Sequence, residues 1–249
     1  MRIMIRIAYD GTAYNGFQSQ KNGVGVQDVL NGALRDLFGQ PVKTISASRT
    51  DAGVHAEGNV CTFDIDTRIA PGKLAYALNA RLPEDIRIVS SEMVPDSFHP
   101  RFQATIKTYA YRIINRPHPD PLTRHTEMHY YYALDADRMN AAAKYLIGEH
   151  DFRSFCAAGY SSKTTVRTIC DARVERDGDR ITFTVTGNGF LYNMVRIIAG
   201  TLIEIGAGKY PPEMMPAILD ARDRDAAGPT AVAKGLVLLG IEYPEYKGM

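Results

Sequence analysis

The sequence predicts an α+β protein built from two similar halves, residues 1–104 and 105–249, each with the element order β-α-β-β-α-β. Three observations predict this fold. Short segments alternate between apolar and polar side chains, as half-buried strands do, among segments whose apolar residues recur at helical spacing. Asp177-Gly178, between two alternating segments, is a strong hairpin signal. The element order of the first half recurs, with insertions, in the second. We therefore expect mainly antiparallel sheets joined side by side, with helices on one side and a cleft between the halves.

In the first half, residues 1–9 alternate and predict a strand, which Asp10-Gly11 ends. Apolar residues at i, i+3, i+4 and i+7 predict a helix over 26–38, closed by Gly39. The other elements expected are a loop at 11–25, a strand at 42–47, a polar loop at 48–56, a strand at 61–65, a helix at 71–82 and a strand at 86–94.

The second half repeats this order with three insertions. Its expected elements are a strand at 105–114, a helix at 137–147, strands at 169–176 and 179–187, a helix at 190–205 and a strand at 235–242. The insertions are a Tyr-rich piece at 129–132, a loop at 151–166 and an extra helix near 212–221.

Composition excludes several classes of protein. The 249 residues are 45% hydrophobic and 23% charged, which is ordinary globular usage. A net charge of +1 excludes nucleic-acid binding by a general excess of positive charge, but not a local basic patch. No uncharged apolar run approaches the ~20 residues that span a bilayer, so we expect no membrane anchor.

The cysteines and the motifs narrow the class further. Cys61, Cys156 and Cys170 are odd in number and far apart, which indicates neither a disulfide framework nor a zinc cluster and predicts a cytoplasmic protein. Gly23 and Gly25 begin a G-x-G, but Asp28 stands at the third glycine position, so no dinucleotide site is expected. We predict no cofactor and no metal.

The loop at 48–56 is the first candidate site. It places the Asp51 carboxylate beside the Arg49 guanidinium. An Asp displayed at a strand end and held ionised by a cation can act as nucleophile or general base. The alternative is a simple turn made by Asp51 and Gly53, with Arg49 in solvent.

The helix within residues 187–206 is the second candidate site. Gly189, Asn193, Arg196 and Gly200 form a small and polar stripe on an otherwise apolar helix. A buried guanidinium needs an anionic partner, and the glycines would leave room for something large. Arg196 would pair either with Asp51 across the cleft, or with a structural acid such as Glu204 or Asp171.

The stretch from His99 to His125 is the third candidate site. It carries five basic residues against one acid, a local charge of +4, and its strand would project Lys107, Tyr109 and Tyr111 from one face. Cations beside aromatic rings suit a phosphate backbone and an unstacked base. The alternative is a solvated edge strand whose tyrosines belong to the core.

These residues carry a resemblance to a known family. The chain resembles the TruA family of tRNA pseudouridine synthases in five stretches that follow the family order. They are YDGTAYNGFQSQ (9–20), SRTDAGVHA (48–56), FHPRFQATIKTYAYRIIN (98–115), GNGFLYNMVRIIAGTLIEIG (187–206) and AVAKGLVLLGIEYP (231–244).

The resemblance implies a role for each candidate residue. Asp51 matches the catalytic aspartate, which would attack C1′ or remove a sugar proton. Arg49 matches a residue linked to base flipping, Tyr109 the tyrosine that stacks on the target base, and Arg196 the basic partner of Asp51. The cleft between the halves would then be the active site.

The resemblance also implies the substrate and the assembly. The substrate would be uridines 38, 39 and 40 in the anticodon stem-loop of tRNA, bound by a homodimer without a cofactor. Two alternatives stay open. One is a non-enzymatic tRNA-binding protein on the same scaffold. The other is a base-excising enzyme, which would need a second carboxylic acid such as Glu57.

Overall fold

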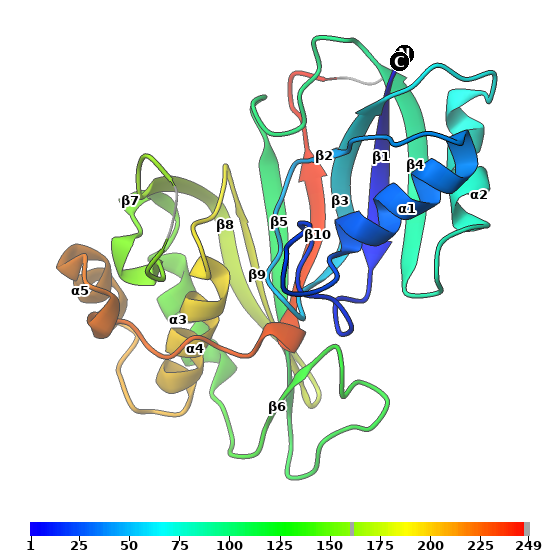
Figure 1. Ribbon diagram of the computed structural model, residues 1–249. Helices are drawn as coiled ribbons and strands as arrows, with labels where there is room; N and C mark the ends of the chain where they lie inside the picture. Colours follow the sequence, from blue (N-terminus) through cyan, green and yellow to red (C-terminus); the bar gives the residue numbers. More distant parts are fainter. Residues whose placement is uncertain (160–161, 247–249) are drawn as a thin grey trace. The chain divides into compact units, whose positions relative to one another are not determined.

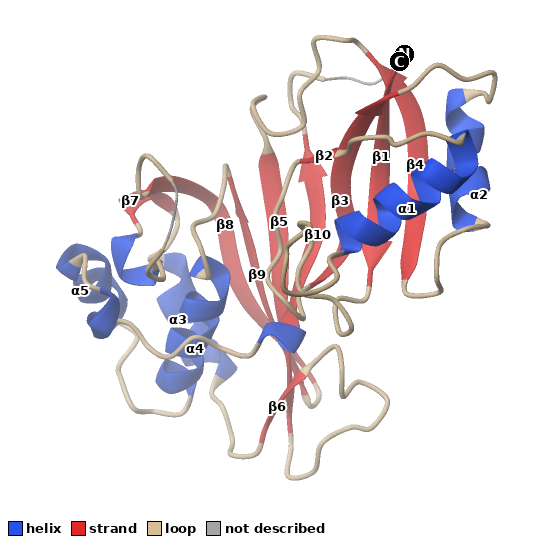
Figure 2. Ribbon diagram, viewed as in Figure 1, coloured by secondary structure: helices blue, strands red, loops and turns tan. Residues whose placement is uncertain are grey.

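The computed structural model describes residues 1–159 and 162–246, which form two compact units (Figures 1 and 2). The first unit comprises residues 1–105 and 238–249, and the second comprises residues 106–237. The boundary after residue 105 lies one residue from the boundary in the sequence prediction. The last strand, which the sequence assigned to the second half, lies largely with the first unit.

The first unit is a sheet with helices packed on it. Its strands follow the order β4-β1-β3-β10, with β2 paired to β3. Phe38 of α1 packs against Phe63 of β3, with the ring centroids 6.4 Å apart. The elements are β1 (Arg2–Tyr9), α1 (Val26–Phe38), β2 (Ile45–Ser46), β3 (His55–Asp64), the 3-10 helix η1 (Pro71–Lys73), α2 (Leu74–Asn79), β4 (Ile86–Val94) and β10 (Leu236–Glu242).

The strands of the second unit follow the order β5-β9-β8-β7, with β6 paired in parallel to β5. Helix α3 packs on β8 and on α4. The elements are β5 (Ile106–Asn115), β6 (Met128–Tyr130), α3 (Ala136–Lys144), β7 (Gly148–Asp151), the 3-10 helix η2 (Arg153–Phe155), β8 (Val166–Asp177), β9 (Arg180–Gly187), α4 (Met194–Gly206), α5 (Met214–Ala221) and the 3-10 helices η3 (Arg224–Ala226) and η4 (Ala233–Gly235).

The predicted α+β class with mainly antiparallel pairing is confirmed. The pairing order β1-β3-β2 in the first unit has the same form as β5-β9-β8 in the second. The joining of the sheets side by side and the cleft between the halves stay predictions. No helix in the described part of the chain is long and apolar enough to span a membrane.

Several element boundaries differ from the prediction. The strand predicted at 42–47 is reduced to Ile45–Ser46, the two residues that pair with β3. Strand β3 begins at His55, not at residue 61, because pairing with β1 extends it through a polar segment. The helix predicted at 71–82 divides into η1 and a shorter α2.

The second unit shows comparable differences. The helix predicted at 190–205 starts at Met194, because Asn193 takes the left-handed conformation (φ +59°) and interrupts the helical run. The loop predicted at 151–166 contains η2 and borders β7, a polar strand that pairing with β8 creates. Residues 160 and 161 of that loop lie outside the described residues.

Candidate active site

Asp51 lies in the loop that joins β2 to β3, on a tight turn. The N–H of Val54 donates to the carbonyl of Asp51 at 3.1 Å, which closes a four-residue turn. Gly53 has φ +75°, the left-handed value that a type II turn needs at its third residue. The turn leaves the Asp51 side chain half-buried at its start.

A second loop, residues 10–17, fixes the turn from one side. The N–H of Phe17 donates to the carbonyl of Thr50 at 3.1 Å, and the N–H of Gly53 donates to the carbonyl of Tyr14 at 3.3 Å. Gly16 has φ +82°, and a Cβ at this position would lie only 2.6 Å from the carbonyl oxygen of Thr50. The close approach therefore requires glycine at position 16.

Buried polar side chains support the loop from below. The Tyr9 hydroxyl hydrogen-bonds the Thr50 hydroxyl at 2.8 Å. The Asn59 amide donates to the carbonyl of Ser48 at 3.1 Å and is completely buried. The β1–β3 register shifts between Ile7 and Tyr9, and this irregularity lies beside the loop. The segment that leads into Asp51 is thus held at two points, Ser48 and Thr50, by side chains of the sheet.

The supporting roles of Asn59 and His55 were not predicted from the sequence. The buried His55 accepts the Gly11 N–H on its Nδ1 at 3.0 Å, with Asp10 at 3.1 Å, so it fixes the start of the neighbouring loop. The available signal was polarity, since Asn59 and His55 stand beside the apolar Val60 and Val54.

Arg49 is exposed and lies in the same loop as Asp51. Within residues 1–159 and 162–246 it forms no ion pair, as expected if it contacts solvent or a bound anion. The role of Arg49 in base flipping stays a prediction.

Tyr109 lies on β5 of the second unit and is 6% exposed. Its ring meets the ring of Phe190 edge-on, with centroids 5.1 Å apart and planes at 79°. Phe190 was not predicted from the sequence; it lies four residues before the start of α4. The contact fixes the plane of the Tyr109 ring.

Arg196 lies in the first turn of α4 and is half-buried. Its Nε donates to the carbonyl of Ala231 at 2.8 Å, and its Nη1 donates to the Asn193 side chain at 2.9 Å. The N–H of Ala231 donates back to the carbonyl of Arg196 at 3.0 Å. These bonds hold the guanidinium in one direction.

The two structural acids considered as partners of Arg196 are engaged elsewhere. Glu204 pairs with Lys209 at 2.7 Å, and Asp171 pairs with Arg173. The pairing of Arg196 with Asp51 stays a prediction.

The expectation that the glycines of this helix leave room for a ligand is wrong at Gly200. A Cβ there would lie 1.8 Å from the carbonyl oxygen of Pro229, so the segment of the chain at 228–231 occupies the space. Gly189 lies before the helix starts.

The comparison with known proteins agrees with the motifs of the sequence. The model of the family described as "tRNA pseudouridine synthase" matches residues 5–103 and 142–244. The chain belongs to the TruA family of tRNA pseudouridine synthases. Asp51, Arg49 and Arg196 lie inside the matched ranges, and Tyr109 lies between them.

Curated TruA-family relatives match over nearly their whole length. The tRNA pseudouridine synthase A of Acetivibrio thermocellus is 46% identical over 241 residues, 97% of this chain and 99% of its own. Those of Thermoanaerobacter sp. (strain X514) and Bacillus subtilis are 47% and 45% identical, covering 97% and 98% of this chain and 99% of each relative. Among solved structures, the archaeal box H/ACA sRNP Nop10-Cbf5 complex matches at 12% identity and a TM-score of 0.37, over 95% of this chain and 46% of that one. So low a score carries no structural conclusion.

Tyr111 belongs to the core and is not available to a TruA-family substrate. It is fully buried, and its hydroxyl donates to the carbonyl of Val232 at 2.8 Å. A Cβ on Gly235 would lie 2.7 Å from the Tyr111 ring, so the two residues pack in contact. The core alternative is therefore correct for Tyr111.

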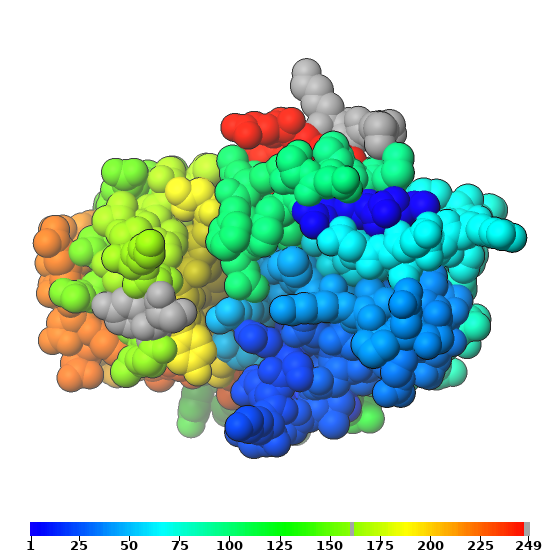
Figure 3. Space-filling view, turned by 45° about the horizontal axis from the view of Figure 1, so that its top comes forward, coloured from blue at the N-terminus to red at the C-terminus, as the bar shows by residue number. Residues whose placement is uncertain are grey.

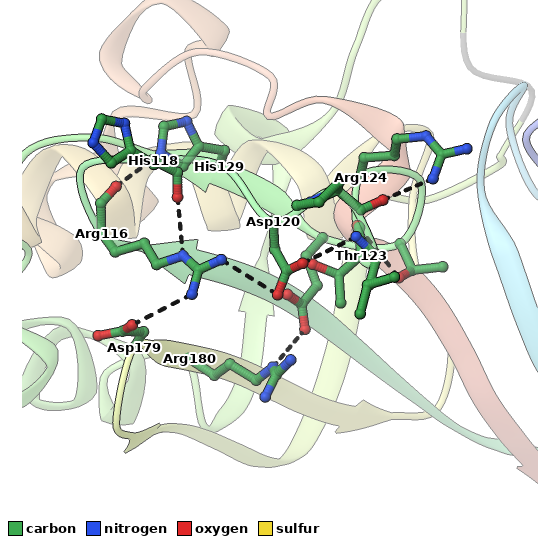
Figure 4. Close-up of polar contacts among 12 residues, drawn as sticks. Arg116, His118, Asp120, Thr123, Arg124, His129, Asp179 and Arg180 are labelled. Atoms are coloured by element: carbon green, nitrogen blue, oxygen red, sulfur yellow. Dashed lines mark hydrogen bonds and ion pairs between the residues drawn. The ribbon is translucent and has the colours of Figure 1, made fainter.

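The basic stretch from His99 to His125 is not a single positively charged surface. Arg116 lies 3.4 Å from Asp120 and 3.8 Å from Asp179, and Arg180 pairs with the buried Glu127 at 3.0 Å (Figure 4). Of the acids outside the stretch, Asp179 lies near Arg116, while Glu127 pairs with Arg180, which is also outside it. The local excess of +4 counted in the sequence therefore overstates the positive charge of this region.

The side chain of His129 binds the backbone of the second unit. His129 lies on β6 as part of a strand, and its Nε2 hydrogen-bonds the carbonyl of Arg116 at 2.8 Å (Figure 4). Among the described residues, no group of three His, Cys, Asp or Glu side chains could hold a metal ion.

Proposed function

We propose that this chain converts uridine to pseudouridine at positions 38, 39 and 40 of the tRNA anticodon stem-loop, with Asp51 as the catalytic carboxylate. One observation carries the proposal. The Asp51 turn is clamped by loop 10–17 and by the sheet below it, in a chain that belongs to the TruA family. A carboxylate carried on a backbone turn that is held by so many contacts is preorganised for chemistry.

The reaction needs only one carboxylate from the protein. The N1–C1′ glycosidic bond breaks, the uracil rotates, and a C5–C1′ bond forms. The C5 proton is lost and N1 regains a proton, so the reaction is an isomerisation with no change in redox state. Asp51 either attacks C1′ or removes a sugar proton to give a glycal, and both routes need Asp51 ionised.

Arg196 is the proposed partner that keeps Asp51 ionised and directs it. Its Nε and Nη1 are already engaged by Ala231 and Asn193, which support a fixed orientation of the guanidinium. A charge-assisted bond from such a preorganised guanidinium needs little further ordering. Arg196 would thus act on the carboxylate and not on the base.

Tyr109 is the proposed stacking partner of the target uracil. Extruding a base from its stack costs a few kcal/mol, and stacking on an aromatic ring returns ~1–3 kcal/mol. Phe190 fixes the plane of the Tyr109 ring, which favours one orientation of the base. Arg49, exposed beside Asp51, would hold the flipped strand or fill the vacated space.

The homodimer belongs to the proposal as well. A chain of net charge +1 offers little long-range attraction to RNA, and the ion pairs around Arg116 reduce its local positive charge further. Two copies would join their basic surfaces into a longer track. Light scattering at micromolar concentration tests this, with a mass of two chains expected and a monomeric mass contradicting it.

The base-excising alternative lacks support for its second acid. Glu57 lies within β3 and not on the Asp51 turn. Free uracil among the products would nevertheless establish that reaction in place of isomerisation.

The test compares Asp51→Asn with Asp66→Asn, a matched change of an exposed aspartate in the same unit. Each full-length variant is incubated with unmodified tRNA transcript, pseudouridine is mapped by nucleotide, and tRNA binding is measured separately. We expect Asp51→Asn to bind tRNA but make no pseudouridine, and Asp66→Asn to match the wild type. A rate above about a tenth of wild type in Asp51→Asn contradicts its catalytic role. A wild-type chain that binds tRNA but makes no pseudouridine would favour the non-enzymatic alternative.

A further inference from the structure

The segment at residues 98–103 of the first unit is anchored firmly at its start. Phe98 is 1% exposed, and its ring meets the rings of Tyr243 and Tyr246 edge-on at 5.0 Å and 5.2 Å. The Tyr243 hydroxyl donates to the carbonyl of Pro100 at 2.9 Å. The residues that follow Pro100 therefore project from a fixed base at the molecular surface (blue-green in Figure 3).

Phe102 projects into solvent as half of a stacked pair. It is 81% exposed, and its ring stacks on the ring of His99, with centroids 4.1 Å apart and planes at 18°. The N–H of Arg101 donates to Nδ1 of His99 at 3.1 Å, which fixes the imidazole. An exposed phenyl ring held in one orientation is a preformed stacking platform.

Two guanidinium groups lie next to this platform. Arg101 donates to the carbonyl of Ser46 at 3.2 Å, which places it beside the start of the Asp51 loop. Burial and, second, the positive charge of Arg49 lower the pKa of Arg101, so the two cations repel each other. In the described part of the chain, neither cation forms an ion pair. An anion bound between them would relieve the repulsion.

We propose that Phe102 and Arg101 form an RNA-binding site adjoining the catalytic loop. Phe102, backed by His99, stacks on an unpaired base other than the target uridine, and Arg101 with Arg49 binds a backbone phosphate. An aromatic ring beside guanidinium groups is the combination that single-stranded nucleic acid selects. An apolar protein partner would instead need a broader apolar surface, and Arg101 and Gln103 flank Phe102 with polar groups.

This inference rests on the proposed function in taking RNA as the ligand. The test measures equilibrium binding of an unmodified anticodon stem-loop transcript to full-length protein carrying Asp51→Asn, so that the RNA stays unchanged during the measurement. In this background we compare Phe102→Ala with Phe102→Trp. Tyr76→Ala, at another exposed aromatic ring of the same unit, serves as the matched control.

We expect Phe102→Ala to weaken binding about 5- to 150-fold and Phe102→Trp to restore it, because stacking is aromatic and sequence-tolerant. Tyr76→Ala should bind as tightly as the background protein. A 2-aminopurine placed at successive loop positions should show stacking-quenched fluorescence at one position, and Phe102→Ala should abolish that quenching. Equal RNA affinities of Phe102→Ala and Tyr76→Ala would overturn the proposal that Phe102 is a stacking platform.

The phosphate contact has a separate readout. Removing one phosphate contact lowers the slope of log Kd against log salt by about 0.7–0.9. We expect that decrease for Arg101→Gln and not for Phe102→Ala, while Arg101→Lys keeps the slope. An unchanged slope in Arg101→Gln, with the fold intact by circular dichroism, would overturn the phosphate site.

The outcomes also separate this inference from the proposed function. If the wild type makes no pseudouridine but Phe102→Ala still weakens RNA binding, the proposed function fails and this site stands. If the wild type makes pseudouridine while Phe102→Ala and Arg101→Gln bind RNA normally, only this inference fails.

Discussion

Substituting alanine for Gly16 should displace the catalytic loop without touching the substrate. The added Cβ would lie 2.6 Å from the carbonyl oxygen of Thr50 and 3.3 Å from the carbonyl carbon of Asp51. To reach the 3.4 Å of ordinary contact, the Thr50 carbonyl must retreat by about 0.8 Å, because packed interiors leave no slack there. Asp51 is the next residue along the chain and must move with it.

The displacement sets the expected loss of rate. A misplacement of about 1 Å at a reacting group can cost about 10²-fold, so we expect a loss of that order in Gly16→Ala. The left-handed φ of +82° adds about 1–2 kcal/mol of destabilisation for a residue with a Cβ. At about 2–4 °C per kcal/mol for a chain of this size, Tm should fall by about 2–8 °C.

The assay is single-turnover release of tritium from RNA labelled at uracil C5, with saturating enzyme, alongside thermal unfolding and RNA binding. Gly32→Ala in α1 is the matched control, because a Cβ there meets nothing within 4 Å. A helix-interior Gly→Ala change should raise stability by about 0.5–1 kcal/mol and leave the rate unchanged. A wild-type rate in Gly16→Ala would refute the claim that this close contact positions Asp51.

Two further predictions follow, one for each unit. Gly200→Ala should destabilise the chain by more than about 3 kcal/mol or expel the segment around Pro229, because the added Cβ would lie 1.8 Å from the Pro229 carbonyl oxygen. Thermal unfolding followed by a tertiary-structure signal would detect either effect. An unshifted Tm would contradict this prediction. Asp64 pairs with Arg2 at 2.8 Å, which lowers the pKa of Asp64, so the pair stabilises the fold above the unfolded pKa of ~4 and is lost as pH falls through the lower folded value. Because the Asp64 side chain is 64% exposed, Asp64→Asn should cost less than about 1 kcal/mol at pH 7 and nothing near pH 2 by urea unfolding; a difference from wild type that persists at pH 2 would contradict the linkage.

Elements with a strong local signal could be predicted from the sequence. Helix α1 occupies the predicted residues because its apolar period and Gly39, which has φ +69°, define both face and end. Strand β4 likewise coincides with its predicted range. Strand β7 was missed because Gly148–Asp151 is polar throughout and becomes a strand only by pairing with β8.

The candidate site likewise contains residues that could be identified from the sequence and residues that could not. Asp51, Arg49, Tyr109 and Arg196 could be selected because motif residues are visible in the sequence. The support beneath Asp51 could not, since the Tyr9–Thr50 bond joins residues 41 positions apart and depends on strand pairing. The stripe of small residues on α4 wrongly predicted room for a ligand at Gly200. A space left by a glycine can be filled by the chain's own backbone, and the sequence does not show which segment packs there.

The position of β10 has a consequence for how this protein matures. The first unit needs residues 238–246 to cover Phe98 with Tyr243 and Tyr246 and to accept the Arg6 guanidinium at the carbonyl of Ile241. During synthesis on the ribosome, the first unit therefore stays incomplete until residues 238–246 emerge. A nascent chain that stops short leaves an open β3 edge and a bare aromatic anchor, so truncated products should aggregate or be degraded before they can bind RNA.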